Sequence, residues 1–128
     1  MAKQLDGARI LIVEDEALIA LDIAGAVDDA GGLTVGPAAS VAEALNLLEC
    51  CDVDGAICDV NLPDGDIGPV LAALQQSGVT TIVHTGGGMP SHLRALYSHV
   101  LVCRKPMRSD RLASTLGEQL GSKGSESA

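Results

Sequence analysis

Residues 9–16, RILIVEDE, place a run of apolar side chains directly before three acidic ones. The apolar part, Ile10 to Val13, has no polar residue at alternate positions, which is typical of a strand covered on both faces of a sheet. The three acids follow at the point where this strand should end. Strands covered on both faces belong to parallel sheets flanked by helices, so the stretch favours an α/β fold.

The rest of the chain repeats this alternation of short apolar runs and amphipathic stretches. Further strands are predicted at 33–36, 56–58, 80–84 and 100–103. Helical spacing of apolar residues predicts helices around 19–30, 41–48, 67–74, 93–97 and 112–120. Ser40 and Glu43 have the spacing of a capping box, and residues 61–65 are predicted to form a loop. Five strands alternating with five helices predict a doubly wound parallel sheet.

Length and composition favour one domain. The chain has 128 residues and 47% hydrophobic content, which suits a single globular unit. We expect an N-terminal extension at 1–7, the domain at 8–120, and a disordered Gly/Ser tail at 121–128. No apolar run approaches the roughly 20 residues that span a bilayer, and no signal peptide is recognisable, so we expect a cytoplasmic protein with no membrane contact.

Charge and aromatic content exclude several functions. Eight basic residues against 17 acidic ones give a formal net charge of −9, which argues against nucleic-acid binding because phosphate contacts need Lys and Arg. Tyr97 is the one aromatic residue among Phe, Trp and Tyr, which makes a flavin pocket hard to build. The four cysteines, Cys50, Cys51, Cys58 and Cys103, form no C-x-x-C pair, and we expect four small buried side chains with free thiols.

Polar residues follow four of the predicted strands. Glu14 and Asp15 follow the first strand, Asp59 the third, Thr85 the fourth and Lys105 the fifth. The carboxyl ends of parallel strands meet at one edge of the sheet, so we expect these side chains to converge there. Acids in such positions also commonly cap the next helix. The complementary groups at all four strand ends favour a functional site.

The expected chemistry is phosphoryl transfer. Three carboxylates gathered at one edge repel one another unless a cation neutralises them, and hard oxygen ligands suit Mg²⁺. Asp59 is placed to attack phosphorus and form an acyl phosphate. Mg²⁺ and Lys105 would supply positioning and charge neutralisation, which such a reaction mostly requires.

With these motifs in this order, residues 8–120 resemble the receiver domain of bacterial two-component response regulators. The motifs are Val13-Glu14-Asp15-Glu16, Asp59-Val60-Asn61-Leu62-Pro63-Asp64-Gly65, His84-Thr85-Gly86 and Lys105-Pro106. The resemblance implies the flavodoxin-like fold with strand order 2-1-3-4-5. It also implies a phosphoacceptor protein that catalyses its own phosphorylation and dephosphorylation and is no enzyme on other substrates.

The resemblance assigns roles to individual residues. Asp59 matches the phosphoacceptor, and Thr85 and Lys105 match the groups that contact the phosphoryl oxygens. Glu14, Asp15, Asp59 and Asn61 match the Mg²⁺ ligands, with Asn61 contributing its backbone carbonyl, and Pro106 matches a cis proline. The implied phosphoryl donor is a histidine kinase or a histidine phosphotransfer protein. Phosphorylation would then switch the binding of a downstream protein, relay the phosphoryl group or drain it from a kinase.

The sequence departs from the family pattern at two positions. The family often has Tyr or Phe three residues before the lysine, where this chain has Val102, and Phe after Lys-Pro, where it has Met107. The usual coupling between the threonine and that aromatic residue therefore cannot operate in its common form. The family's surface for partners and dimers corresponds to residues 90–120, which here carry Tyr97, Arg94, Arg108 and Arg111, and a homodimer would form through it.

Three other readings remain beside the phosphoacceptor. The main alternative is a degenerate receiver that acts as a binding or dimerisation module without phosphorylation. A phosphohydrolase with an aspartate nucleophile usually carries a second carboxylate two residues later, where this chain has Asn61. A flavin carrier on the same fold is disfavoured by the near absence of aromatic residues.

Overall fold

A computed structural model describes residues 4–127, with side-chain environments for residues 4–121. The parallel strands are β1 (Arg9–Val13), β2 (Leu33–Ala38), β3 (Gly55–Cys58), β6 (Thr80–Thr85) and β7 (Leu101–Arg104). The helices are α1 (Ala17–Asp29), α2 (Val41–Cys50), α3 (Gly68–Gln76), α4 (Ser91–Leu96) and α5 (Ser109–Ser127). These elements confirm the predicted alternation of strands and helices.

The strands form one parallel sheet in the order β2-β1-β3-β6-β7. This is the predicted order 2-1-3-4-5, counted over the parallel strands that the structure describes. Val13 pairs with Cys58 across β1 and β3, and Thr85 pairs with Arg104 across β6 and β7. This register brings the carboxyl ends of the central strands level with one another, so the residues that follow them gather at one edge.

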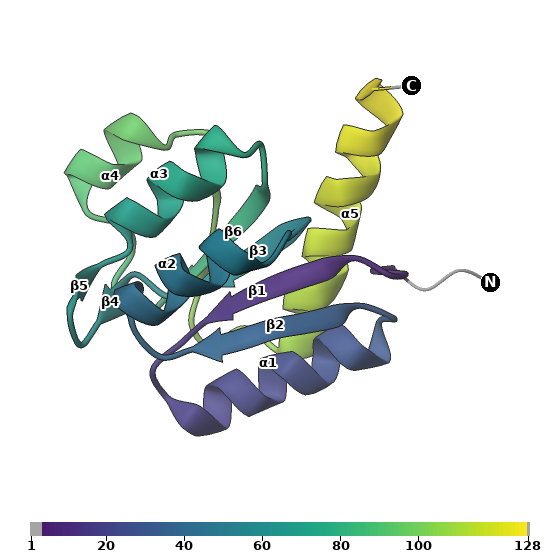
Figure 1. Ribbon diagram of the computed structural model, residues 1–128, viewed down its shortest axis with the longest axis horizontal. Coiled ribbons are helices and arrows are strands. Elements are labelled where there is room, and N and C mark those ends of the chain that lie inside the picture. The colour runs from purple at the N-terminus through teal and green to yellow at the C-terminus, as the bar shows by residue number, and fades with distance from the viewer. Residues whose placement is uncertain (1–3, 128) are drawn as a thin grey trace.

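Each face of the sheet carries its own apolar core. Helices α1 and α5 lie on one face, and α2, α3 and α4 lie on the other (Figure 1). The α1–α5 core contains buried residues such as Ile12, Ile23 and Leu116. The core on the other face contains Leu71 and Leu93, among others. Burial on both sides explains why β3, and β1 from Ile10 to Val13, carry no polar residue at alternate positions.

Two short strands occupy the segment that the sequence predicted as a loop. β4 (Asn61–Leu62) and β5 (Gly65–Asp66) form a two-stranded antiparallel ladder, in which Asn61 pairs with Asp66 and Leu62 with Gly65. Pro63 and Asp64 form the turn between them, and Gly65 has a positive φ of 141°. Because only two residues pair on each side, no alternating pattern could reveal this hairpin in the sequence.

Asp64, in the hairpin turn, caps helix α2. Its carboxylate accepts hydrogen bonds from the backbone N–H groups of Val41 and Ala42, at 2.8 and 3.0 Å. Half of the predicted capping box is present, since Ser40 Oγ accepts from the N–H of Glu43 at 3.1 Å, while the Glu43 carboxylate accepts the N–H of Ala39 at 2.7 Å. Helix N-termini leave N–H groups without intrahelical acceptors, and here side chains from two segments satisfy them. The hairpin that follows Asp59 is thereby fastened to α2.

Leu5, in the expected N-terminal extension, packs into the core, and helix α5 continues into the expected C-terminal tail. Leu5 is 1% exposed, belongs to the α1–α5 core, and donates its N–H to the carbonyl of Ala30 at 2.9 Å. Helix α5 continues through the expected tail to Ser127, since each residue added to an existing helix gains a backbone hydrogen bond. Residues 1–3 and 128 lie outside the described chain. Among the described residues, no helix combines the length and the apolar character needed to cross a membrane.

Replacement of Leu5 by Ala tests whether the N-terminal segment belongs to the core. Loss of a fully buried leucine side chain should lower the free energy of unfolding by about 2–5 kcal/mol. The matched control is Leu21→Ala on α1, because Leu21 is 64% exposed and its loss should change stability by no more than about 0.5 kcal/mol. Urea denaturation of both variants measures the difference, and equal effects would show that Leu5 contributes nothing to the core.

Removal of the Asp64 carboxylate should destabilise the protein in a pH-dependent way. Hydrogen bonds from Val41 and Ala42 hold the pKa of Asp64 below its ordinary value of 3.8. Its stabilising contribution is therefore complete above about pH 4 and is lost as the pH falls through the lower, folded-state pKa. Asp64→Ala should lower the Tm at pH 7, and the gap to wild type should narrow below pH 4.

The control for this measurement is Asp52→Ala, which removes an exposed carboxylate from the loop after α2. Its Tm should follow that of the wild type at every pH. A Tm gap for Asp64→Ala that stayed constant down to pH 2 would contradict the capping role of the ionised carboxylate.

Candidate functional site

The sheet register brings Glu14 and Asp59 together at the carboxyl edge. Asp59 follows β3 and donates its N–H to the carbonyl of Val13 at 2.9 Å, while Glu14 donates its N–H to the carbonyl of Ala38 at 2.9 Å. Each acid thus prolongs the ladder of its strand by one hydrogen bond, which fixes its backbone. Glu14 is 2% exposed and Asp59 is 9% exposed, so both carboxylates are largely removed from water.

Lys105, which follows β7, bridges the two buried acids. Its Nζ lies 3.1 Å from Glu14 Oε1 and 3.1 Å from Asp59 Oδ2. The lysine side chain is itself 19% exposed. Ion pairs in such positions are screened less by solvent than those on an open surface. One ammonium group therefore links the residues that follow three different strands, β1, β3 and β7.

The pKa values in this cluster follow from burial and from the bridging lysine. Burial raises the pKa of Glu14, and the nearby charge of Asp59 raises it further. The hydrogen bonds from the backbone N–H of Glu16 and from the Lys105 side chain lower it in part. Burial by itself would lower the pKa of Lys105, but its hydrogen bonds to Asp59 and Glu14 prevail and raise it. Lys105 therefore stays charged, while its single positive charge leaves the acids incompletely neutralised.

The donor atoms of this edge fit a divalent cation. Carboxylate oxygens of Glu14, Asp15 and Asp59 lie within 4.8 Å of one another, and among the described residues they are the one cluster of three or more potential metal ligands. Asp15 is exposed and completes the open side of the cluster. Hard oxygen donors with an open side suit Mg²⁺, which keeps several waters. Asn61 is exposed at the start of β4, two residues after Asp59.

The two oxygens of Asp59 have different environments. Oδ1 accepts a hydrogen bond from the N–H of Val60 at 2.7 Å, and Oδ2 accepts one from Lys105 Nζ at 3.1 Å. These two bonds fix the plane of the carboxylate. A carboxylate that is oriented in this way and partly open to solvent can attack an electrophile that enters from the open side.

Thr85 lies at the end of β6, next to Lys105. The N–H of Lys105 donates to the Thr85 carbonyl at 2.9 Å. The threonine side chain is 1% exposed, yet its Oγ1 has no hydrogen-bond partner among the described residues. Buried hydroxyls normally have a partner, and one without it costs stability. An anion beside Lys105 would give this hydroxyl an acceptor.

His84 is a feature of the site that the sequence did not assign. It is 5% exposed, and neither ring nitrogen has a hydrogen-bond partner among the described residues. Burial, together with the positive charge of Lys105, lowers the pKa of His84, which keeps the ring neutral at physiological pH. With Leu18, Ile19 and Met107 it lines a cleft of about 390 Å³ that also reaches Lys105.

The loop after Thr85 leaves the site open on one side. A Cβ atom added at Gly86 or Gly87 would meet no atom within 4 Å. Val102 is partly buried on β7 and packs, like Tyr97, against the core of the α2–α4 face. No aromatic side chain therefore stands at position 102 to follow a movement of Thr85. Valine at position 102, which the sequence showed as a departure from the family pattern, therefore also changes the packing there, since an aliphatic side chain occupies the place of an aromatic one.

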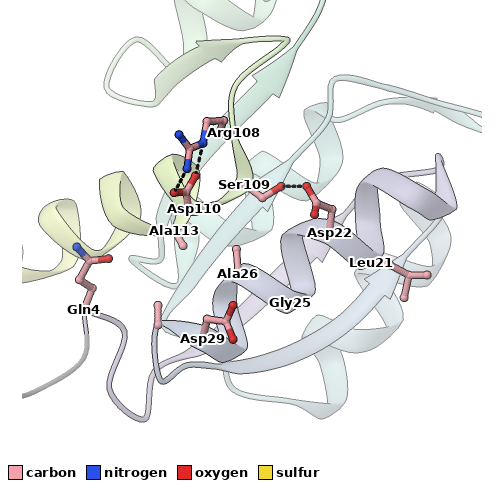
Figure 2. Close-up of a pocket in the computed structure, with 11 residues that line it drawn as sticks. Gln4, Leu21, Asp22, Gly25, Ala26, Asp29, Arg108, Ser109, Asp110 and Ala113 are labelled. Atoms are coloured by element: carbon pink, nitrogen blue, oxygen red, sulfur yellow. Dashed lines mark hydrogen bonds and ion pairs between the residues drawn. The ribbon is translucent and has the colours of Figure 1, made fainter.

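A second groove lies between α1 and α5 (Figure 2), and it shares Asp22 and Ser109 with the cleft that reaches Lys105. It measures about 530 Å³. At one end Ser109 Oγ donates to Asp22 Oδ2 at 2.6 Å, and Arg108 pairs with Asp110 at 2.7 Å. The Ser109–Asp22 bond joins the start of α5 to α1 and so holds the segment after Lys105 in place. None of the predicted site residues lines this groove.

The structure thus brings together Glu14, Asp15, Asp59 and Lys105, as the sequence predicted, with Thr85 joined to Lys105 through the backbone. The Lys105–Pro106 peptide bond is cis, as the resemblance implied. Sequence reasoning missed the capping role of Asp64, because its partners lie 22 and 23 residues away. It also missed the buried state of His84, although a histidine at the end of an apolar strand offered a signal.

Comparison with known proteins agrees at the level of structure. No known family profile matches the sequence, and no curated protein matches it. Among solved structures, the response regulator PhyR from Brucella abortus is similar at 27% identity and a TM-score of 0.79, over 97% of this chain and 52% of that one. The anti-anti-sigma factor PhyR from Bartonella quintana is similar at 26% identity and a TM-score of 0.76, over 97% of this chain and 51% of that one.

A CheY-like receiver domain protein from Methanospirillum hungatei matches along nearly its whole length. The identity is 25%, the TM-score is 0.83, and the match covers 94% of this chain and 99% of that chain. By contrast, the chain spans about half the length of the two PhyR proteins. The resemblance predicted from the motifs is thereby confirmed: the chain has the CheY-like fold of response regulator receiver domains.

Proposed function

We propose that the protein is a phosphoacceptor response regulator, which receives a phosphoryl group on Asp59 in a Mg²⁺-dependent reaction. The observation that carries this proposal is the Lys105 ammonium, 3.1 Å from both Glu14 and Asp59. It orients one carboxylate as a nucleophile and supplies positive charge for an incoming phosphoryl group. The receiver-domain fold and the PhyR-like neighbours support the proposal.

In the proposed reaction, a carboxylate oxygen of Asp59 attacks the phosphorus of a phosphorylated histidine. An O–P bond forms, the P–N bond to the imidazole breaks, and the departing ring takes up a proton. The donor is a histidine kinase or a histidine phosphotransfer protein. The hydrogen bond from Val60 and the contact with Lys105 hold the carboxylate in its attacking orientation. The chain catalyses only this transfer and the later hydrolysis of its own acyl phosphate.

Glu14, Asp15, Asp59 and the carbonyl of Asn61 would hold the Mg²⁺ ion. The ion supplies charge neutralisation between the carboxylates and the phosphoryl oxygens. Glu14 is the inner support of this set, since its buried carboxylate also accepts the N–H of Glu16 at 3.1 Å. Asp15, which is exposed, is the residue best placed to contact an ion that arrives from solvent.

Thr85 would signal the phosphorylated state. Its partnerless buried hydroxyl can donate to a phosphoryl oxygen beside Lys105, and that new bond favours a conformation in which Thr85 and the following glycines have moved. Position 102 carries valine rather than an aromatic residue, so we propose that the change is expressed in the 86–88 loop and in α4. The short helix α4 and its glycine-rich approach provide little resistance to such a movement.

The surface formed by residues 90–120 is the proposed site for a downstream protein or a second copy of the chain. Leu96 is 65% exposed and Leu101 is 37% exposed on this surface. Arg94 and Arg111 are exposed as well, while Arg108 already pairs with Asp110. Apolar side chains beside arginines are typical of interface centres. The identity of the partner decides the outcome of binding, which is a switched output, a relayed phosphoryl group or a phosphoryl group drained from a kinase.

The alternative is a degenerate receiver that binds partners without phosphorylation. Val102 in place of an aromatic residue favours it, because the usual route from the threonine to the surface is absent. The intact set of acids and lysine at the carboxyl edge favours the phosphoacceptor instead. Binding of Mg²⁺ separates the two, since a purely structural domain has no need of a functional metal site.

Incubation with acetyl phosphate and Mg²⁺ tests the phosphoacceptor role. The wild-type protein should gain the mass of one phosphoryl group in intact-mass spectrometry, because Asp59 is oriented and partly open. Asp59→Asn should gain none, and wild type without Mg²⁺ should gain little. Asp66→Asn is the matched control, since it changes a carboxylate of the neighbouring hairpin that lies outside the cluster; it should be phosphorylated like wild type.

Absence of the adduct in the folded wild-type protein, together with no change in its spectrum on titration with beryllofluoride and Mg²⁺, would support the degenerate receiver. An adduct that persisted in Asp59→Asn would place the phosphoryl group on another residue and would contradict the proposed site.

Thr85→Val separates the signalling role of this hydroxyl from a structural one. Valine keeps the shape of threonine and removes a buried polar group that has no partner. The free energy of unfolding should therefore stay the same or rise, by at most about 3 kcal/mol. Phosphorylation of Asp59 should persist. Beryllofluoride with Mg²⁺ should raise the Tm of wild type more than that of the variant, because only the wild type gains a new hydrogen bond. A lower Tm of the unliganded variant would contradict this account.

A further inference from the structure

Cys50 and Cys51 form an accessible pair of thiols, contrary to the prediction that all four cysteines are buried. Cys58 and Cys103 are buried, whereas Cys50 is exposed and Cys51 is partly exposed. The Sγ atoms of the pair lie 3.4 Å apart. Adjacent residues usually point in different directions, both in helices and in strands. Here α2 ends between them, because Cys51 has extended backbone angles of φ −133° and ψ 138°, and both side chains reach the same side.

The spacing of the two sulfurs suits a single atom held between them better than a direct bond. A disulfide needs the sulfurs at about 2.05 Å and the Cα atoms at least about 4.4 Å apart. The trans peptide bond between neighbouring residues fixes those Cα atoms at about 3.8 Å. Two sulfurs bound at about 2.3 Å to one central atom, with an angle of about 90–110°, lie about 3.3–3.8 Å apart. The observed separation falls in this range.

The surroundings select the kind of central atom. Thiolates prefer soft centres, and a zinc ion held by protein almost always takes four ligands. Among the described residues, no third His, Cys, Asp or Glu ligand converges with this pair. A centre that needs only two sulfur ligands and carries its own third substituent therefore fits. A trivalent arsenic atom with one organic group has this valence.

A cleft beside Cys51, with both apolar and polar walls, offers room for that organic group. The cleft measures about 550 Å³ and lies between the ends of α2 and α3. Its lining combines the apolar side chains of Leu45, Leu48, Val53 and Val79 with polar residues that include Glu49 and Asp52, and Cys51 is part of it. A flat aromatic ring attached to the central atom could bury part of its surface there.

We propose that Cys50 and Cys51 constitute a vicinal dithiol site for aryl-substituted trivalent arsenicals. The step is a substitution without oxidation or reduction. Two As–S bonds form, the two As–O bonds of the arsonous acid break, and each hydroxyl leaves as water with one thiol proton. The hydrogen bond between the two thiols raises the pKa of Cys51, which favours its thiol form before the reaction.

The dithiol site is separate from the phosphoacceptor. Cys51 precedes β3 and Asp59 follows it, so the two sites lie at opposite ends of a strand about 13 Å long. None of the site residues Glu14, Asp15, Asp59 and Lys105 lines the cleft beside Cys51. Occupation of the dithiol should therefore leave phosphorylation of Asp59 unchanged, and the two proposals can fail independently.

Intact-mass spectrometry with phenylarsine oxide tests the proposal. The reduced full-length protein should gain one phenylarsenic group with loss of one water, and an excess of the dithiol 2,3-dimercaptopropanol should remove it while a monothiol at the same thiol concentration should not. Cys50→Ser and Cys51→Ser should each lose at least 90% of the adduct that survives a monothiol wash. Circular dichroism should show that both variants remain folded.

The double variant Cys50→Ser/Cys51→Ser is the control for the two buried cysteines, which it retains. An adduct of undiminished amount in this variant, or retention of the washed adduct in either single variant, would overturn the proposal. Failure of the wild type to form the adduct under reducing conditions would overturn it as well. Zn²⁺ offered alone should not bind to the pair, and a 1:1 zinc complex that the double variant loses would assign the site to a metal ion instead.

Discussion

The contact of Lys105 with Glu14 and Asp59 is the constraint on which the arrangement depends. Two carboxylates buried side by side destabilise the fold unless a positive charge lies between them, and removing one partner of such a group leaves an uncompensated buried charge. The ammonium, 3.1 Å from each acid, provides that charge. Because the three residues follow β1, β3 and β7, the same contact couples chemistry to the assembly of the sheet.

Strand register determines whether this contact can exist. The pairing of Val13 with Cys58 sets Glu14 beside Asp59, and the pairing of Thr85 with Arg104 brings Lys105 to the same edge. A slip by one residue would send each side chain to the opposite face of the sheet. Burial of the central strands on both faces resists such a slip, since residues from Ile10 to Val13 are at most 1% exposed. The apolar core therefore holds the charged site in register.

Much of this could be predicted from sequence because it depends on short periodic patterns and on strand ends. The parallel sheet and the cluster of Glu14, Asp15, Asp59 and Lys105 follow from the alternation of strands and helices, whereas the strand order was implied by the resemblance of the motifs to receiver domains. The rest depends on contacts between distant segments. Asp64 caps a helix more than 20 residues before it in the chain, and Leu5 enters the core from a segment with no repeating pattern. Cys50 and Cys51 were expected to be buried, but α2 ends at Cys50, and both thiols are accessible to solvent there.

The site combines a fixed half and an unsatisfied half, and that division suits a switch. Glu14 and Asp59 are held by backbone hydrogen bonds and by Lys105, so they present one geometry. Thr85 carries a buried hydroxyl without a partner, followed by glycines with open space around them. A ligand shifts a conformational equilibrium only by the difference in its contacts between the two states. An anion on the fixed half would create that difference at Thr85, whose buried hydroxyl has no hydrogen-bond partner among the described residues and whose next two glycines have open space beside them.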